Sequence, residues 1–220
     1  MLPQMQTKTR QRTSRSAGWS PANLLAFVRV CERLKVELRH SWLSDGSQES
    51  VAEHSWLMAM LALLTHNELE HPVDIHRTLE MVIVHDLIEA LCGDVPYTAD
   101  ASTRRLKADR ERSAMTSIRE SLPAHVGDRI FGLWREYEDR RTREARFAKA
   151  LDNLEVQMQH NLADLRTWDD VEYDLVYTKM DPHCAHDSFL RDLCAAVKSD
   201  AEDKWRRSGI DPAAIRARST

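Results

Sequence analysis

The sequence predicts an all-α protein, and three observations support this fold class. Apolar residues recur at helical spacing through most of the chain, and no segment alternates apolar and polar residues over the length of a strand. The 220 residues include only 6 Gly and 7 Pro, too few turn residues for a many-stranded sandwich or barrel. Because no repeat or linker interrupts the pattern, we expect one helical domain over residues 19–205, with a disordered arm over 1–18 and a flexible tail over 206–220.

The first helix is predicted to begin at Ser20-Pro21, which combines an N-cap serine with proline at the first helical position. It should end before residues 39–49, which we interpret as a loop because they contain Ser-Asp-Gly-Ser. A second helix should begin near Ser50, with Glu53 as its capping-box partner, and continue to about residue 69.

A third helix is predicted over residues 75–91, closed by Gly93, and residues 95–103 are interpreted as a loop. Further helices are expected over 104–121, 124–139, 142–165 and 185–205, and none is predicted over 166–184. Trp56 and Trp134 stand at helical spacing among apolar residues, so both are expected in the core.

Charge and composition exclude several classes of function. The formal net charge of −4 gives no electrostatic footprint for a nucleic acid polymer. No run approaches the roughly 18 apolar residues that span a bilayer, so no membrane partner is expected. Residues 1–18 contain four basic and no acidic residues; this fits a transit peptide or a disordered basic arm, and we favour the arm. Four widely spaced cysteines without a CxxC motif indicate a reducing compartment, the cytoplasm.

Three apolar helical segments are interrupted by residues of the kind that bind metals: His54, the adjacent pair His85-Asp86, and Asp152. Burying an imidazole or a carboxylate costs several kcal/mol unless the group is paired or bound to a cation. A single such histidine is usually a hydrogen-bonded core residue, but three interruptions together are harder to explain in that way. Imidazole nitrogens with carboxylate oxygens suit a divalent transition-metal ion.

The order His, His-Asp, Asp resembles the signature of the HD-domain metal-dependent phosphohydrolases. The surrounding residues are similar to the 5′-deoxynucleotidase branch, which contains the bacterial YfbR-type enzymes and eukaryotic HD-domain-containing relatives. The similar motifs are Arg39 with Trp42, His85-Asp86-x-x-Glu89-x-x-x-Gly93-Asp94-x-Pro96, Leu133-Trp134-x-Glu136-Tyr137-Glu138 and Ala145-x-Phe147-x-Lys149-x-Leu151-Asp152-x-x-Glu155. The resemblance extends over roughly residues 20–165 and implies a single HD-domain helical bundle.

The resemblance implies hydrolysis of deoxyribonucleoside 5′-monophosphates to a deoxynucleoside and phosphate by a homodimer. One divalent ion, Co²⁺, Mn²⁺, Zn²⁺ or Fe²⁺, is expected on the ligands His54, His85, Asp86 and Asp152.

Two substrate-binding residues, Arg39 and Trp42, are expected on the same resemblance, with the Arg39 guanidinium on the phosphate. Glu89 and Asp94 are the candidate catalytic residues. Glu89 is expected to orient or deprotonate the attacking water, and Asp94 to contact the sugar hydroxyl or protonate the leaving O5′. Spacing does not distinguish the acid from the base.

Other functions remain open at this point. An HD-type nucleoside triphosphate triphosphohydrolase, or another nucleotide phosphodiesterase, would need extra cations, which only residues 104–107 offer. A di-iron oxygenase would need further histidines between the HD pair and Asp152, where only His125 lies. A non-catalytic HD module would be expected to lack a ligand, and none is missing.

Overall fold

The computed structural model describes residues 19–94 and 101–219, so the arm expected over 1–18 lies outside the described residues. The predicted all-α class is confirmed, with one small hairpin added. The elements are α1 (Pro21–Glu32), η1 (Arg33–Lys35), β1 (Leu38–Trp42), β2 (Gln48–Ser50), α2 (Val51–Thr65), α3 (Ile75–Val84), α4 (Glu89–Cys92), α5 (Ala101–Ser121), α6 (Ala124–Asp139), α7 (Arg143–Leu162), η2 (Leu165–Thr167), α8 (Asp170–Thr178), α9 (Asp181–Cys184), α10 (Ser188–Arg207) and α11 (Pro212–Arg218).

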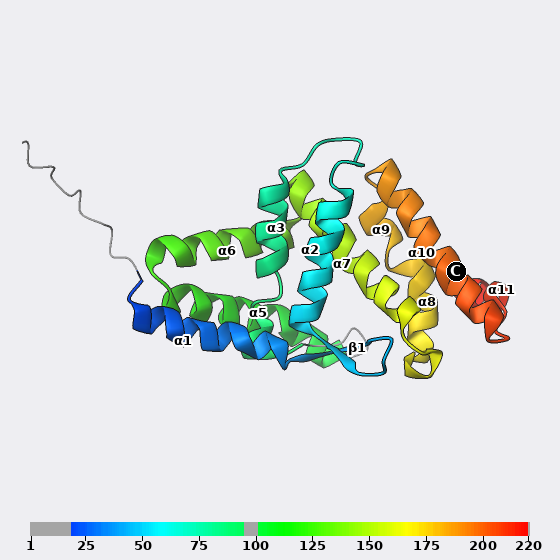
Figure 1. Cartoon of the computed structure of the whole chain (residues 1–220), viewed down its shortest axis with the longest axis horizontal. Helices are drawn as coiled ribbons and strands as arrows, with labels where there is room; N and C mark the ends of the chain where they lie inside the picture. Colours follow the sequence, from blue (N-terminus) through cyan, green and yellow to red (C-terminus); the bar gives the residue numbers. More distant parts are fainter. Residues whose placement is uncertain (1–18, 95–100, 220) are drawn as a thin grey trace, which may run out of the picture.

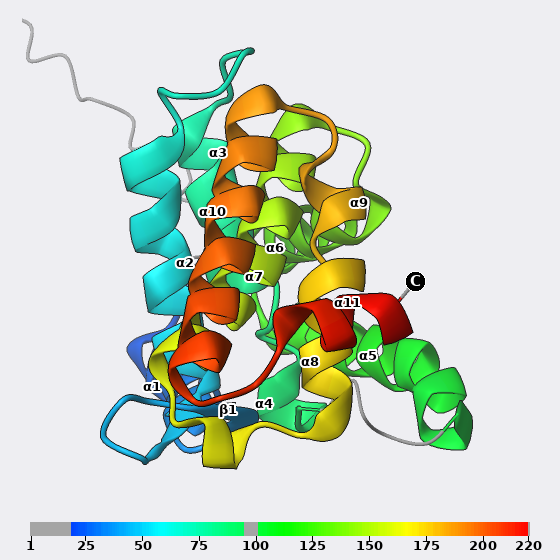
Figure 2. The same ribbon diagram turned by 90° about the vertical axis from the view of Figure 1, so that its right-hand side faces the viewer.

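Helices α2, α3 and α7 form the centre of the molecule and pack against one another (Figure 1). The pair α5 and α6 lies on one side of this centre, and α8 to α11 lie on the other. Figure 2 shows α10 beside α7, a contact that ties the last third of the chain to the central helices. No helix within residues 19–94 and 101–219 is long and apolar enough to cross a membrane.

The main core lies between α2, α3, α6, α7 and α10, and its most deeply buried side chains include Met58, Met81, Phe147, Leu151 and Leu190. The predicted core position of Trp134 is confirmed, since it is 8% exposed. The same prediction for Trp56 is wrong, because its side chain is 65% exposed on α2. Helical spacing predicts a face of the helix, but it does not reveal which faces find a partner.

The predicted helix starts at Ser20 and Ser50 are confirmed. The side chain of Ser20 accepts a hydrogen bond from the backbone N–H of Asn23 at 3.1 Å. Ser50 and Glu53 form a complete capping box, in which Glu53 accepts the backbone N–H of Ser50 at 2.7 Å. This cap fixes the start of α2 immediately after the hairpin, three residues before His54.

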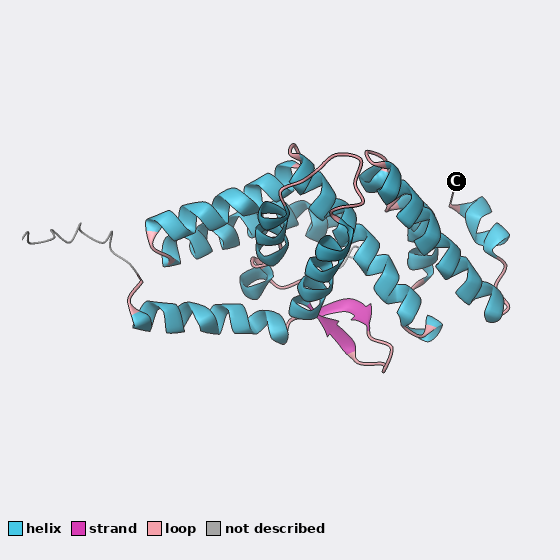
Figure 3. Cartoon of the chain, turned by 45° about the horizontal axis from the view of Figure 1, so that its top comes forward, coloured by secondary structure: helices cyan, strands magenta, loops and turns pink. Residues whose placement is uncertain are grey.

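The loop predicted over residues 39–49 is wrong at both of its ends. β1 and β2 form an antiparallel hairpin in which Leu38 faces Ser50 and Trp42 faces Gln48 (Figure 3). The Ser-Asp-Gly-Ser segment is its turn, where Gly46 has a φ of 88°. Strands of five and three residues are too short for an alternating pattern to be recognised.

The helix predicted over 75–91 is two helices. α3 ends at Val84, and the chain passes through turn residues 85–88, with Leu87 N–H bonded to the Val84 carbonyl at 3.0 Å, before α4 begins at Glu89. The apolar residues continue through this turn, so periodicity alone could not reveal the break.

The C-terminal region is more ordered than the sequence indicated. Helices α8 and α9 occupy part of the segment 166–184, for which no helix was predicted. The flexible tail expected over 206–220 contains α11, whose Ile215 is 8% exposed in a second apolar cluster around Trp205. A seven-residue helix gives little periodic signal, and its stability comes from this tertiary contact.

Candidate active site

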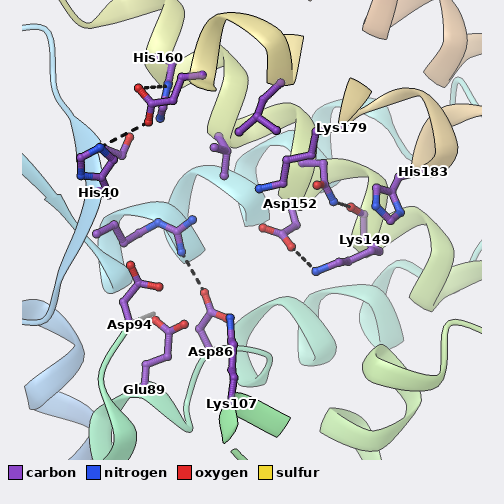
Figure 4. A pocket seen from close by; sticks show the side chains of 16 residues that line it. His40, Asp86, Glu89, Asp94, Lys107, Lys149, Asp152, His160, Lys179 and His183 are labelled. Carbon is purple, nitrogen blue, oxygen red and sulfur yellow. Dashed lines mark hydrogen bonds and ion pairs between the residues drawn. The ribbon is translucent and has the colours of Figure 1, made fainter. Parts of the chain in front are cut away.

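A pocket of about 330 Å³ opens between the hairpin, the turn after α3, and helices α7 and α8 (Figure 4). Its walls combine acidic and basic side chains with few apolar ones. The lining residues are Arg39, His40, Ser41, Asp86, Glu89, Asp94, Lys107, Lys149, Asp152, Asn153, Val156, His160, Glu172, Leu175, Lys179 and His183.

The four predicted metal ligands converge from three elements: His54 from α2, His85 and Asp86 from the turn after α3, and Asp152 from α7. Nε2 of His54 lies 3.3 Å from Oδ1 of Asp152 and 3.8 Å from Oδ2 of Asp86. Nε2 of His85 lies 3.0 Å from that same Asp86 oxygen. Ligand atoms of His54, His85 and Asp152 lie within 4.8 Å of one another, close enough to bind one ion.

Both imidazoles are oriented so that Nε2 faces the other ligands. Nδ1 of His85 donates to the Val82 carbonyl at 2.7 Å, and Nδ1 of His54 contacts the Glu155 carboxylate at 2.5 Å. Each Nε2 is buried and makes no well-directed hydrogen bond within the described part of the chain. Histidine that donates through Nδ1 presents a lone pair at Nε2, which is the form that binds metals. These residues therefore fit a divalent cation.

The second oxygen of Asp152 is already occupied. Oδ2 accepts a hydrogen bond from the Tyr137 hydroxyl at 2.7 Å and from Nζ of Lys149 at 2.8 Å. The oxygen near His54 is Oδ1, so this arrangement leaves one Asp152 oxygen for a metal ion.

Basic neighbours lower the pKa values of the two carboxyl groups among the proposed ligands. Burial raises the pKa of Asp152, but Lys149 and His54 outweigh this effect and hold the pKa well below its usual value. The pKa of Asp86 is lowered in the same way, with His85 and Arg39 outweighing burial. Both carboxylates therefore stay ionised at neutral pH.

The pKa of His54 responds to the same charges. Burial and Arg39 lower it, but Glu155 and Asp152 raise it further, to about 10. The carboxylates around His54 thus favour a positive charge at this place, either a proton or a metal cation.

Arg39 lies on β1, next to the carboxylate of Asp86. Its NH1 group donates to Oδ2 of Asp86 at 3.2 Å, and its side chain is 14% exposed. Burial lowers the pKa of Arg39, but Asp86 and Asp152 raise it more, so the guanidinium stays charged. The hairpin that the sequence did not predict is therefore the element that positions this cation.

Glu89 and Asp94 both line the pocket next to Asp86 (Figure 4). Glu89 is only 6% exposed, and its Oε2 is buried without a hydrogen-bond partner in the described residues. Burial, Asp86 and Asp94 raise the pKa of Glu89 to about 9. Gly93, with a φ of 76°, ends α4, and the backbone N–H of Asp94 donates to Glu37 at 3.0 Å.

Trp42 is not among the residues that line the pocket. Its carbonyl accepts a hydrogen bond from Gln159 at 2.7 Å, and its ring packs edge-on against His40 at a centroid distance of 4.8 Å. His40, which lines the pocket, also lies 3.0 Å from Asp169. Trp42 therefore lies behind the pocket wall, in contact with the pocket residue His40.

The sequence did not reveal several residues of the site. Tyr137 and Lys149 were noted only as parts of family-like motifs, although the spacing of Lys149 and Asp152 places both on one helix face. The pocket wall formed by Glu172 and Lys179 comes from α8 and the residue after it, for which no helix was predicted. Sequence spacing gave no signal for Glu49, whose carboxylate has an oxygen within 4.8 Å of a ring nitrogen of His54 and of an oxygen of Glu155.

The fold and the site together define an HD-domain protein. The sequence model of the family described as "HD domain" matches residues 31–188, well over half of the chain, so the chain belongs to that family.

Curated relatives place it more closely. The 5′-deoxynucleotidase HDDC2 of Dictyostelium discoideum is 37% identical over 146 residues, covering 63% of this chain and 76% of that protein. The 5′-deoxynucleotidase HDDC2 of Bos taurus is 35% identical over 145 residues, covering 65% of this chain and 69% of that protein. Within the HD family the chain therefore belongs with the 5′-deoxynucleotidases.

Solved structures share the fold of this chain. A protein described as a predicted metal-dependent phosphohydrolase from Magnetospirillum magnetotacticum superposes with a TM-score of 0.69 at 30% identity, covering 87% of this chain and 95% of that one. A conserved hypothetical protein from Pyrococcus furiosus gives a TM-score of 0.60 at 25% identity, covering 80% of this chain and 99% of that one.

Proposed function

We propose that the chain is a metal-dependent 5′-deoxynucleotidase that hydrolyses deoxyribonucleoside 5′-monophosphates to a deoxynucleoside and phosphate. The observation that supports this best is the pair of buried Nε2 atoms of His54 and His85, which lie beside two ionised carboxylates and make no well-directed hydrogen bond within residues 19–94 and 101–219. The similarity to proteins named 5′-deoxynucleotidase supplies the substrate class.

His54, His85, Asp86 and Asp152 would hold one divalent ion, Co²⁺, Mn²⁺, Zn²⁺ or Fe²⁺. Bound there, such an ion supplies Lewis-acid polarisation of a phosphate oxygen and lowers the pKa of a water molecule. Val82, Glu155, Tyr137 and Lys149 hold the ligands in place through the hydrogen bonds described above.

Arg39 binds the phosphate. Its charge is secured by the surrounding carboxylates, and its NH1 group already lies 3.2 Å from the proposed ligand Asp86, so a phosphate on the ion would meet the guanidinium. Lys107, which is labelled in Figure 4, lines the same pocket and adds positive charge.

Glu89 orients or deprotonates the attacking water, because it lines the pocket and its buried Oε2 has no hydrogen-bond partner within the described residues. A cation bound beside Asp86 would lower the pKa of Glu89 from its raised metal-free value, and so free the carboxylate for this role. Asp94 contacts the sugar hydroxyl or protonates the leaving O5′. Trp42 supports substrate binding through its ring contact with His40.

The direct test is phosphate release from a panel of deoxyribonucleoside monophosphates, ribonucleoside monophosphates and deoxyribonucleoside triphosphates, with Co²⁺, Mn²⁺, Zn²⁺ or Mg²⁺ added to chelator-treated protein. We expect deoxyribonucleoside monophosphates to be the best substrates. No release from any monophosphate with any metal would refute the proposal.

A nucleoside triphosphate triphosphohydrolase is the second candidate, because Lys107, Lys149 and Lys179 line the pocket in addition to Arg39. Release of triphosphate rather than phosphate in the same panel would favour it.

We also propose that the protein is a cytoplasmic homodimer. The free thiols of all four cysteines fit a reducing compartment. Trp56 and Leu64 on α2 are 65% and 68% exposed, apolar area of the kind that subunits cover. Light scattering of the purified protein tests the dimer, and a fluorescent fusion in cells tests the compartment.

A further inference from the structure

Two carboxyl groups lie buried behind the proposed metal ligands. Glu49 on β2 is 1% exposed and Glu155 on α7 is 0% exposed, and neither lines the pocket. Their oxygens lie within 4.8 Å of each other and of a ring nitrogen of His54. Because burying a carboxyl group is costly, a pair that cannot touch substrate needs another explanation.

One end of this pair is bound to His54. Oε2 of Glu155 lies 2.5 Å from Nδ1 of His54, opposite the Nε2 atom that faces Asp86 and Asp152. Glu155 lies one helical turn after Asp152 on α7, so the same helix provides a ligand and the group that orients another ligand.

The other end of the pair lies against Arg39. Oε2 of Glu49 is 3.6 Å from Nε of Arg39, across the two strands of the hairpin. Neither atom has a hydrogen-bond partner within the described residues, and Oε1 of Glu155 has none. The side chains that carry these unpartnered atoms are neighbours, since Glu49 lies 3.6 Å from Arg39 and has an oxygen within 4.8 Å of an oxygen of Glu155.

We propose that Glu49 and Glu155 are positioning residues, forming a buried bridge that fixes the metal ligand His54 relative to the phosphate ligand Arg39. Glu155 sets the ring orientation of His54, and Glu49 connects Glu155 to the Arg39 side chain. The bridge links the hairpin to α7, so the distance between bound metal and bound phosphate is set inside the protein. This inference rests on the metal site proposed above.

The alternative explanation of the same cluster is a second metal ion held by Glu49, His54 and Glu155. The 2.5 Å contact between His54 and Glu155 opposes it, because a hydrogen bond of that length leaves no room for an ion between the two atoms.

The test compares the purified wild type with E155Q, E49Q and the control E202Q. Glu202 is also buried, at 7% exposed, but lies on α10 and pairs with Arg206 and Arg216, away from the pocket. The measurements are the Co²⁺ affinity by chelator competition, the number of Co²⁺ ions bound, the visible spectrum of the Co²⁺ form, and the inhibition constant of inorganic phosphate.

We expect E155Q to weaken Co²⁺ binding by about 10–100-fold and to change the Co²⁺ spectrum, since second-shell partners of histidine ligands typically have this effect. E49Q should mainly raise the phosphate inhibition constant. In the double variant the two effects should not be additive, because both residues belong to one bridge. E202Q should match the wild type.

Wild-type Co²⁺ affinity and spectrum in E155Q would overturn the inference. If E155Q does not fold by circular dichroism, E49Q decides, and an unchanged phosphate inhibition constant would overturn it. Two Co²⁺ ions per wild-type chain, falling to one in E49Q, would show ligands instead of positioning residues. A wild type that binds no divalent metal would refute the proposed function itself, a different outcome from wild-type binding that survives in the variants.

Discussion

Replacing Glu89 with glutamine separates its proposed chemical role from its structural one. The two side chains have the same shape. Glu89 is buried, and its Oε2 has no hydrogen-bond partner in the described part of the chain, so the change breaks no hydrogen bond made there by that atom. Glu89 is not among the proposed metal ligands. The variant should therefore fold and bind Co²⁺ as the wild type does.

The expected loss is in turnover. A positioned general acid or base contributes about 10²–10⁴-fold, so kcat of E89Q should fall by that factor, or about 3–5 kcal/mol in activation free energy. KM should change little, because Arg39, which is proposed to bind the phosphate, and the residues proposed to hold the metal ion are intact.

The assay is steady-state phosphate release at saturating metal, paired with Co²⁺ affinity by chelator competition. E202Q, which alters a buried carboxylate on α10, is the matched control. If E89Q turned over at near the wild-type rate with metal bound, the role assigned to Glu89 would be wrong. A parallel loss of Co²⁺ affinity would instead make Glu89 part of the metal site.

Four further outcomes are expected. R39K keeps the charge but loses the planar fork, so the KM for the nucleotide should rise about 10-fold or more, with metal affinity unchanged in titration. Y137F removes a buried donor to Asp152 and should lower the free energy of unfolding by about 1–3 kcal/mol in urea denaturation. I215A should lower the free energy of unfolding by about 2–4 kcal/mol in the same measurement if α11 is integral to the fold. An unchanged free energy of unfolding would instead favour a flexible tail. Without metal, the pKa of Glu89 is about 9 in the folded chain and about 4.5 in the unfolded chain, so between these values only the folded chain keeps the proton. The free energy of unfolding should therefore fall as the pH rises through this window, and it should fall less steeply in E89Q.

Helices α2 and α7, which carry His54 and Asp152, could be predicted because their caps and apolar spacing are local. Ser50 and Glu53 mark the start of α2 in sequence and in structure, and the four proposed ligands stood out as polar residues within apolar runs. The hairpin could not be predicted in this way, because its strands are short and stabilised by pairing with each other.

The turn after α3 shows a second limit. Leu87 and Ile88 continue the apolar pattern, so the sequence predicts an unbroken helix, while the structure turns at residues 85–88. The turn therefore places Glu89 in the pocket. The sequence predicts the same pocket on another ground, since residues four apart on an unbroken helix lie on one face.

The helical class and the starts of the main helices follow from the sequence, because local hydrogen bonding and periodic burial set them, and the sequence also contains the residue types that suit a metal ion. Which buried groups meet depends on how the helices and the hairpin pack together. This packing brings Glu49 from a hairpin and Glu155 from α7 to the back of His54, and Tyr137 from α6 to the second oxygen of Asp152. Residues so far apart in the chain have no common period, and only packing in three dimensions brings them into contact.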